Sequence, residues 1–145
     1  MDIYDTAAVQ KVWQRVGLTS PESDCAQLLA LITRNSAAQQ SYCALSSRGK
    51  TYQCLARQTA GQIKKLQAIY FVLTGKTAPH PCPRREPVCF TPCFLRQLIE
   101  NAQADARRLR ELAQQFTAYR SPLLCMAQED DRAAQVLLTC LAGRL

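Results

Sequence analysis

The sequence predicts an all-α fold in which four long helices form two helical hairpins. Apolar residues recur at intervals of three and four along most of the chain. Apolar and polar residues do not alternate one by one over any longer stretch, as they would in a strand. A hydroxyl residue followed by proline, a typical helix start, occurs at Ser20-Pro21, Thr91-Pro92 and Ser121-Pro122. With 145 residues, 48% of them hydrophobic, the chain suits one compact domain and is not a disordered one.

The first hairpin is predicted over residues 20–75. Its first helix begins at Ser20-Pro21, and Ser46–Lys50 is expected to be a tight connection. The second helix is expected to end at Thr74-Gly75, because glycine adopts the left-handed conformation that closes many helices. A short additional helix is predicted within residues 1–19, where the apolar residues at helical spacing are Val9, Val12, Trp13 and Val16.

A proline-rich crossover over residues 76–90 is expected to join the two hairpins. Four prolines in this stretch exclude a regular helix or strand. The second hairpin is predicted over residues 91–145, with one helix from Thr91 to about Arg120 and the next from Ser121 to the C-terminus.

The two hairpins resemble each other in their apolar positions. Those of the first helix recur 67 positions later in the third, and the pairs are Leu28 and Leu95, Leu31 and Leu98, Ile32 and Ile99, and Leu45 and Leu112. A duplicated hairpin with one long connection is a known form of four-helix bundle.

The sequence resembles the ferritin-like superfamily, specifically its rubrerythrin-type branch. The resemblance extends over most of the chain, and it is carried by Val12–Val16, Leu31-Ile32, Tyr42–Leu45, Leu66–Gly75, Leu95-Arg96 and Leu112-Ala113. It implies an up-down four-helix bundle built around two metal ions. In that family two helices each give one Glu, and the other two each give a Glu-x-x-His pair.

The resemblance also locates the positions that match these metal ligands. They are occupied by Asn35 in the first helix, Thr59 and Gln62 in the second, Ala102 in the third, and Asp130 and Ala133 in the fourth. One carboxylate and no histidine remain, so we expect no di-iron site and none of the family's peroxidase or ferroxidase activity. We favour an interior refilled by small and amide side chains that hydrogen-bond to each other. The alternative is a small pocket at Asn35, Thr59 and Gln62 that holds water or a polar ligand.

The crossover and the start of the third helix carry a second candidate site. His80, Cys82, Cys89 and Cys93 form a His-x-Cys-x6-Cys-x3-Cys pattern, a donor set that suits zinc or iron, although the spacing matches no common ligand pattern. A disulfide from Cys82 to Cys89 or Cys93 is one alternative, and reduced thiols are the other. Cys93 is the candidate for a reactive thiol, because the dipole of the helix that starts at Thr91 favours a thiolate there.

The chain has eight cysteines, and we expect most of them to act as small hydrophobic residues within the helices. The acidic start, Met1–Asp5, lacks the features of a signal peptide, and no stretch approaches a membrane span, so a cytoplasmic protein is expected.

The net charge of +7 is unevenly distributed along the chain. Residues 25–85 contain no Asp or Glu. They hold nine basic residues, namely Arg34, Arg48, Lys50, Arg57, Lys64, Lys65, Lys76, Arg84 and Arg85. An anionic partner such as nucleic acid is one interpretation, and a solvated basic face is the one we favour, because the charges are not interleaved with aromatic residues.

Three functional hypotheses follow from the sequence. The first is a non-catalytic rubrerythrin-like bundle without a cofactor, which acts as a structural or binding protein and self-associates or binds a protein partner through a helix face. The second is a metal- or redox-responsive protein that uses zinc or iron at the crossover cysteines, or their thiol chemistry. The third is a basic nucleic-acid-binding protein.

Overall fold

A computed structural model describes residues 21–78 and 88–143 of the chain, with side chains from Cys25 onwards. The helix predicted within residues 1–19 and the crossover residues 79–87 lie outside the described residues. The described part contains four long helices and no strand, which confirms the all-α prediction. The helices are α2 (Pro21–Ala44), α3 (Lys50–Thr74), α4 (Pro92–Gln115) and α5 (Arg120–Ala142).

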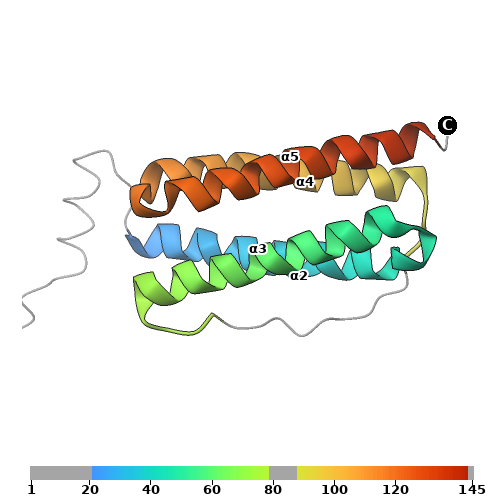
Figure 1. The fold of residues 1–145 in the computed structure, drawn as a ribbon. Coiled ribbons are helices and arrows are strands. Elements are labelled where there is room, and N and C mark those ends of the chain that lie inside the picture. The colour runs from blue at the N-terminus through green and yellow to red at the C-terminus, as the bar shows by residue number, and fades with distance from the viewer. Residues whose placement is uncertain (1–20, 79–87, 144–145) are drawn as a thin grey trace, which may run out of the picture.

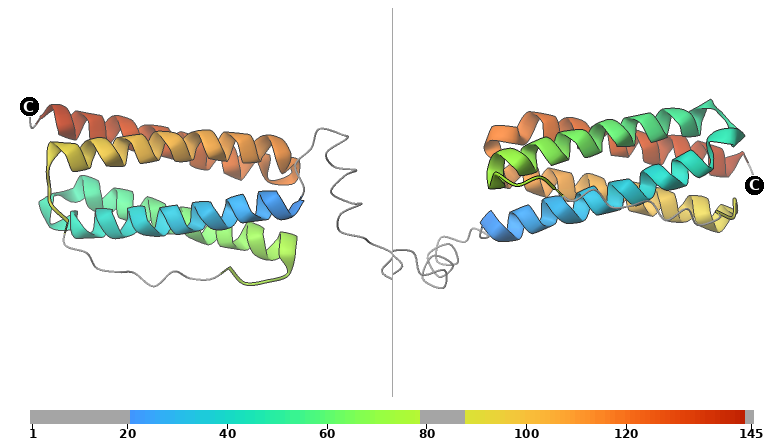
Figure 2. Two further views of the ribbon diagram at one scale, coloured as in Figure 1. Left: turned by 180° about the vertical axis from the view of Figure 1, so that it is seen from behind. Right: turned by 90° about the horizontal axis from the view of Figure 1, so that it is seen from below.

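The helices pack as two hairpins, as the sequence predicts. Helix α2 packs along α3, and α4 packs along α5 (Figure 1). The hairpins meet through α3 with α5 and through α2 with α4, and the view from behind in Figure 2 shows α2 and α4 side by side. All four neighbouring pairs are antiparallel, and α3 ends at the opposite end of the bundle from the start of α4 (Figure 1). The connection between these two helices must therefore span the length of the bundle.

The ends of the first hairpin agree with the predicted turn residues. The short 3-10 turn η1 (Ser46–Arg48) joins α2 to α3 within the predicted connection. Gly75 ends α3 in the left-handed conformation, with φ of 70°, and its amide donates a 2.7 Å hydrogen bond to the Phe71 carbonyl. A side chain at this position would be strained, which explains why glycine closes the helix.

The second hairpin differs from the prediction at its turn. Helix α4 ends at Gln115 rather than near Arg120, and a 3-10 turn, η2 (Thr117–Tyr119), leads directly into α5. The rings of Phe116 and Tyr119 pack against the hydrophobic core, which requires the chain to leave the line of α4 before this turn. Ser121 lies inside α5 and does not start it, and no side chain caps this helix.

The hydrophobic core consists of two clusters, one in each half of the bundle. In the half where α2 begins, the cluster includes Leu28, Leu66, Leu109 and Met126, all less than 2% exposed. In the other half it includes Leu45, Leu95 and Leu137, also less than 2% exposed. Every long helix contributes to both clusters, so the residues between the clusters lie at the middle of all four helices.

A few large apolar side chains lie on the outer surface. Phe71, Val72 and Leu73 are exposed near the end of α3, and Val136 and Leu138 are exposed on α5. Among the described residues, no helix combines the length and the apolar character that crossing a membrane requires.

The two Ser/Thr-Pro signals of the second hairpin provide a matched test of helix capping. Thr91 Oγ1 accepts a 3.1 Å hydrogen bond from the Phe94 amide at the start of α4, whereas Ser121 makes no cap bond. We expect Thr91→Ala to lower the free energy of unfolding by about 1 kcal/mol. The control, Ser121→Ala, should change it by less than about 0.5 kcal/mol. Urea unfolding followed by circular dichroism measures both, and equal losses would contradict the assignment of Thr91 as the cap.

Candidate functional site

The positions that match the metal ligands of the family that the sequence resembles lie at the middle of the bundle, where Ala102 and Ala133 are members of one hydrophobic cluster. Asn35, Thr59, Gln62, Ala102 and Ala133 are all buried, and they come from all four helices. Asp130 on α5 is partly exposed as a residue, but its Oδ2 atom is fully buried.

The spacing of the sequence explains why these side chains share one level. In α3 the inward residues run Leu55, Thr59, Gln62 and Leu66, at intervals of four, three and four. The same intervals separate Leu98, Ala102, Asp105 and Leu109 in α4. They also separate Met126, Asp130, Ala133 and Leu137 in α5. Large apolar residues therefore flank two smaller or polar inward positions in each of these helices. We call the central level, comprising Arg34, Asn35, Thr59, Gln62, Ala102, Asp105, Asp130 and Ala133, the polar layer.

Gln62 is the centre of a hydrogen-bonded chain across the polar layer. Its Oε1 accepts a 3.5 Å hydrogen bond from Asn35 Nδ2 on α2. Its Nε2 donates to Asp130 Oδ1 on α5 at 3.1 Å and to the Met126 carbonyl at 3.5 Å. One amide thus links three helices. Thr59 does not join this chain, because its hydroxyl donates to the Leu55 carbonyl of its own helix at 2.8 Å.

Asp130 is the one acidic residue among the six ligand-matching positions, and its carboxyl group is electrostatically unusual. Burial raises its pKa to about 7, and the neighbouring charges of Asp105, Glu129 and Asp131 act in the same direction. The hydrogen bond from Gln62 opposes the rise without cancelling it. Within the described part of the chain, Oδ2 has no hydrogen-bond partner. This carboxyl group is therefore about half protonated at neutral pH.

A second buried carboxylate, Asp105, was not among the residues singled out from the sequence. It lies on α4 with 4% of its surface exposed, and Arg34 Nε on α2 donates to its Oδ1 at 2.7 Å. Arg108 lies farther away, at 3.7 Å from the same oxygen. Burial raises the pKa of Asp105, while the hydrogen bond and charge of Arg34 oppose the rise. The signal for its burial was present in the sequence, because Asp105 follows Ala102 by three positions and precedes Leu109 by four.

Tyr42 lies near both carboxyl groups. It is 4% exposed and follows Asn35 by two helical turns on the same face of α2. Burial raises the pKa of its hydroxyl group most strongly, and the charges of Asp130 and Asp105 raise it further. The polar layer and the neighbouring Tyr42 thus bring acidic and neutral groups close together, and each of the four long helices contributes at least one of these groups.

The structure only partly covers the crossover site. His80 and Cys82 lie outside the described residues. Cys89 and Cys93 are both exposed near the start of α4, and neither forms a disulfide with another described cysteine. Across residues 25–78 and 88–143, no three His, Cys, Asp or Glu side chains gather closely enough to hold a metal ion.

The exposure of the cysteines contradicts the expectation that most of them act as small hydrophobic residues within the helices. Most of the described cysteines are exposed to solvent, namely Cys43, Cys54, Cys89, Cys93 and Cys125. Cys43, Cys54, Cys93 and Cys125 lie on helices beside the apolar face rather than on it, and Cys89 precedes α4. Cysteine is compatible with both environments, so the apolar pattern alone did not distinguish them.

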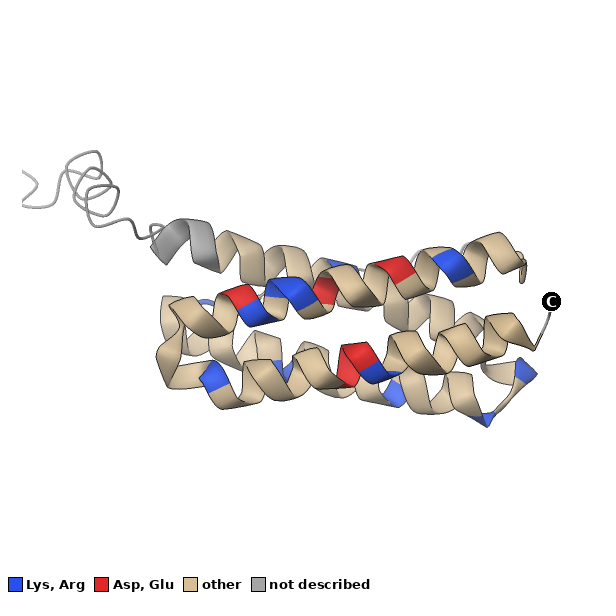
Figure 3. Ribbon diagram, turned by 90° about the horizontal axis from the view of Figure 1, so that it is seen from above, with Lys and Arg blue, Asp and Glu red and all other residues tan. Residues whose placement is uncertain are grey.

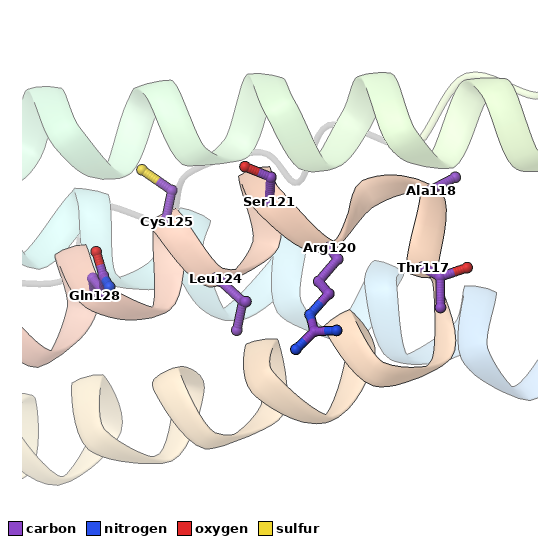
Figure 4. Close-up of a pocket in the computed structure, with 7 residues that line it drawn as sticks. All are labelled: Thr117, Ala118, Arg120, Ser121, Leu124, Cys125 and Gln128. Carbon is purple, nitrogen blue, oxygen red and sulfur yellow. The ribbon is translucent and has the colours of Figure 1, made fainter.

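An open pocket of about 540 Å³ lies at the turn between α4 and α5, away from the polar layer. It is lined by Thr117, Ala118, Arg120, Ser121, Leu124, Cys125 and Gln128. Figure 4 shows Ser121 and Cys125 pointing toward α3, while Arg120 and Leu124 point toward α4. The polar side chains that line this pocket do not point toward a common centre, so they are not arranged as a catalytic site.

The charges divide between the two hairpins. From Cys25 onwards, every acidic side chain that the structure describes lies on α4 or α5, as Figure 3 shows, while Glu22 and Asp24 belong to the first turn of α2. Between Cys25 and Ala78 the α2–α3 hairpin carries basic and no acidic side chains, and Arg57, Lys64 and Lys65 are exposed on α3. Arg34 differs from these, because it points inward and pairs with Asp105.

The raised pKa of Asp130 predicts a specific pH dependence of stability. The carboxyl group ionises at 3.8 in the unfolded chain and at about 7 in the folded one, so the folded state binds the extra proton between these values. Its contribution to stability is complete at low pH and is lost as the pH rises from about 4 to about 7, by about 4 kcal/mol in total.

Asp130→Asn should remove this contribution. The variant is expected to be more stable than the parent chain at pH 8, by about 2 to 4 kcal/mol, and to show a shallower loss of stability between pH 4 and 7. Urea unfolding at several pH values measures the effect. Glu111→Gln, at an exposed acid on α4 that is not among the charges acting on Asp130, serves as the control and should leave the slope nearly unchanged. An unchanged slope in the Asp130 variant would contradict the assignment.

The Arg34–Asp105 pair is expected to contribute more to stability than the exposed Arg110–Asp131 pair. Arg34→Met leaves Asp105 buried with only the more distant Arg108 nearby, at a cost of about 2 kcal/mol at pH 8. Arg110→Met breaks a pair in which both side chains are more than 40% exposed, and it should cost less than about 1 kcal/mol. If both variants lost the same free energy of unfolding, measured by thermal or urea unfolding, the buried pair would contribute no more to stability than the exposed one.

Comparisons with protein-family models, curated proteins and solved structures found no match to this chain. The resemblance to the ferritin-like superfamily therefore rests on the residues quoted above and on the four-helix arrangement.

Proposed function

We propose that this chain is a ferritin-like bundle of the rubrerythrin type that has lost its di-iron site and acts as a non-catalytic structural or binding protein. The observation that supports the proposal best is the position of Gln62. It occupies one ligand-matching position and hydrogen-bonds to residues at two others, Asn35 and Asp130. A direct amide network occupies positions where the family would place metal ligands.

The helix arrangement supports the family assignment. Two antiparallel hairpins and a connection that spans the bundle are features of ferritin-like bundles with one long crossover. The ligand-matching positions fall on all four helices and lie inward at one level, which is the geometry that an interior metal site would require.

The donor chemistry supports the loss of the metal site. Iron in such a site needs several carboxylates and two imidazoles, whereas these positions offer amides, a hydroxyl, two methyl groups and one carboxylate. The additional acid of the layer, Asp105, is already engaged by Arg34. The only histidine of the sequence, His80, belongs to the crossover. We therefore propose no oxidoreductase or ferroxidase activity.

The proposed binding role uses an outer helix face, through self-association or a protein partner. Exposed apolar side chains on α5, Val136 and Leu138, are the type of residue that such contacts bury. A second candidate function, metal or redox sensing at the crossover, is supported by the exposure of Cys89 and Cys93, which leaves both side chains accessible.

Metal analysis of the purified untagged protein, prepared under reducing and anaerobic conditions, separates the candidates. The proposal predicts no stoichiometric metal. One zinc or iron per chain that is lost in Cys89→Ser or Cys93→Ser would support the sensing function instead. Two irons per chain would contradict the proposed loss of the di-iron site.

Restoring the ligands tests the family assignment directly. The six-substitution variant Asn35→Glu, Thr59→Glu, Gln62→His, Ala102→Glu, Asp130→Glu and Ala133→His should bind two Co²⁺ ions per chain with visible ligand-field absorption and a raised melting temperature. The matched control carries only the four Glu substitutions, and it should bind less metal because it lacks imidazole ligands.

Two results of this experiment would contradict the family assignment. One is a folded six-substitution variant that binds no Co²⁺. The other is a variant that is unfolded without metal and is not folded by added Co²⁺, because a correctly placed site couples binding to folding.

A further inference from the structure

The end of α3 carries a concentrated apolar surface that the described residues do not cover. Phe71 is 54% exposed, Val72 is 66% exposed and Leu73 is 39% exposed, and Ala68 lies exposed one turn earlier. We call these four residues the α3 end patch. By contrast, Ile69 of the same turn is buried in the core. Three consecutive large apolar residues outside the core are typical of a surface that another segment covers.

The α3 end patch lies at the end of the bundle where α2 begins. Helices α2 and α3 are antiparallel, so Thr74 and Pro21 are at the same end (Figure 1). The chain before Pro21 therefore enters the bundle close to the patch. That N-terminal segment has 20 residues, which is long enough for a helix of several turns and a short linker.

We propose that the N-terminal segment of this same chain docks on the α3 end patch. Its apolar residues Val9, Val12, Trp13 and Val16 have the spacing of one face of a helix, so the sequence provides an apolar stripe without an assigned partner. The α3 end patch provides the apolar surface that such a stripe needs.

The linker is long enough for this docking. Packed helix axes lie about 8–10 Å apart, and the four residues from Gly17 to Ser20 span up to about 13 Å when extended. The segment therefore reaches the neighbouring helix α3 without any change in the bundle.

The N-terminal segment carries both acidic and basic residues, and one of its acids, Asp5, lies opposite basic residues of α3 in this arrangement. A segment that runs beside α3 with Val16 near Val72 places Asp5 about 16 Å farther along the helix. On α3, Lys64 lies about 12 Å and Arg57 about 22 Å from Val72, and both are exposed. Asp5 thus falls between two basic residues of α3, a helix that contains no acidic residue.

The single tryptophan of the chain provides the test, because Trp13 lies in the docking segment. In the full-length protein we expect Trp13 emission at shorter wavelength, and weaker acrylamide quenching, than in the same protein unfolded in urea. Both values should be independent of protein concentration. Phe71→Ser combined with Val72→Asp should move the emission and the quenching to the values of the unfolded chain.

A matched control places equivalent changes on another exposed apolar surface. Val136→Asp combined with Leu138→Asp on α5 should leave Trp13 emission unchanged. Circular dichroism should confirm that both double variants keep the helical bundle, since all four substituted residues lie on the surface.

Three outcomes would overturn the proposal. Trp13 emission like that of the unfolded chain would show that the segment is not docked. An unchanged emission in the Phe71 and Val72 variant would place the docking elsewhere. Burial of Trp13 that is lost on dilution would show that a second copy of the chain covers the surface.

Discussion

The hydrogen-bonded Gln62 amide, between Asn35 and Asp130, is the interaction on which the middle of the bundle depends. The two hydrophobic clusters on either side are filled with leucines that pack without directional preference. The polar layer is different, because each polar group moved out of water costs free energy unless a partner lies within hydrogen-bond distance. A shift of α3 by one turn would separate Gln62 from both partners and bring Asp130 against apolar side chains. The layer therefore sets the axial register of α2, α3 and α5, and the Arg34–Asp105 pair adds α4.

Under the function proposed above, the same layer accounts for a bundle that stays folded without metal. A di-metal centre holds several buried carboxylates by neutralising their charge. In this chain most inward positions of the layer carry neutral side chains, and the two acids that remain are accommodated in different ways. Asp105 is paired with Arg34, and the pKa of Asp130 rises to about 7, so that part of the population stays neutral. The polar layer thus contains fewer buried charges than a di-metal site would, and its side chains still form hydrogen bonds between the helices.

Much of the fold could be predicted from the sequence, because the apolar spacing of leucines such as Leu28, Leu66 and Leu137 specifies which face of each helix is buried. The inward location of Asn35 and Gln62 was implied by the resemblance, which matches these positions to metal ligands that point into the bundle. The partnership of Arg34 with Asp105 was not, because these residues lie 71 positions apart and pair only once the hairpins meet. The early end of α4 at Gln115 was also missed, since it depends on the packing of Phe116 and Tyr119 rather than on a local stop signal. The cysteines were misjudged because their size suits both the core and the surface.

The division of charge between the hairpins gives the described part of the molecule an electric dipole moment across its long axis. The positive side is the α2–α3 hairpin, which carries no acidic side chain between Cys25 and Ala78, and the acids described from Cys25 onwards lie on α4 and α5. Near an anionic surface the field would turn the elongated bundle onto its side, with α3 and its exposed Arg57, Lys64 and Lys65 facing that surface. This orientation would weaken as salt is added, because at physiological ionic strength the field of a charge extends only about 8 Å.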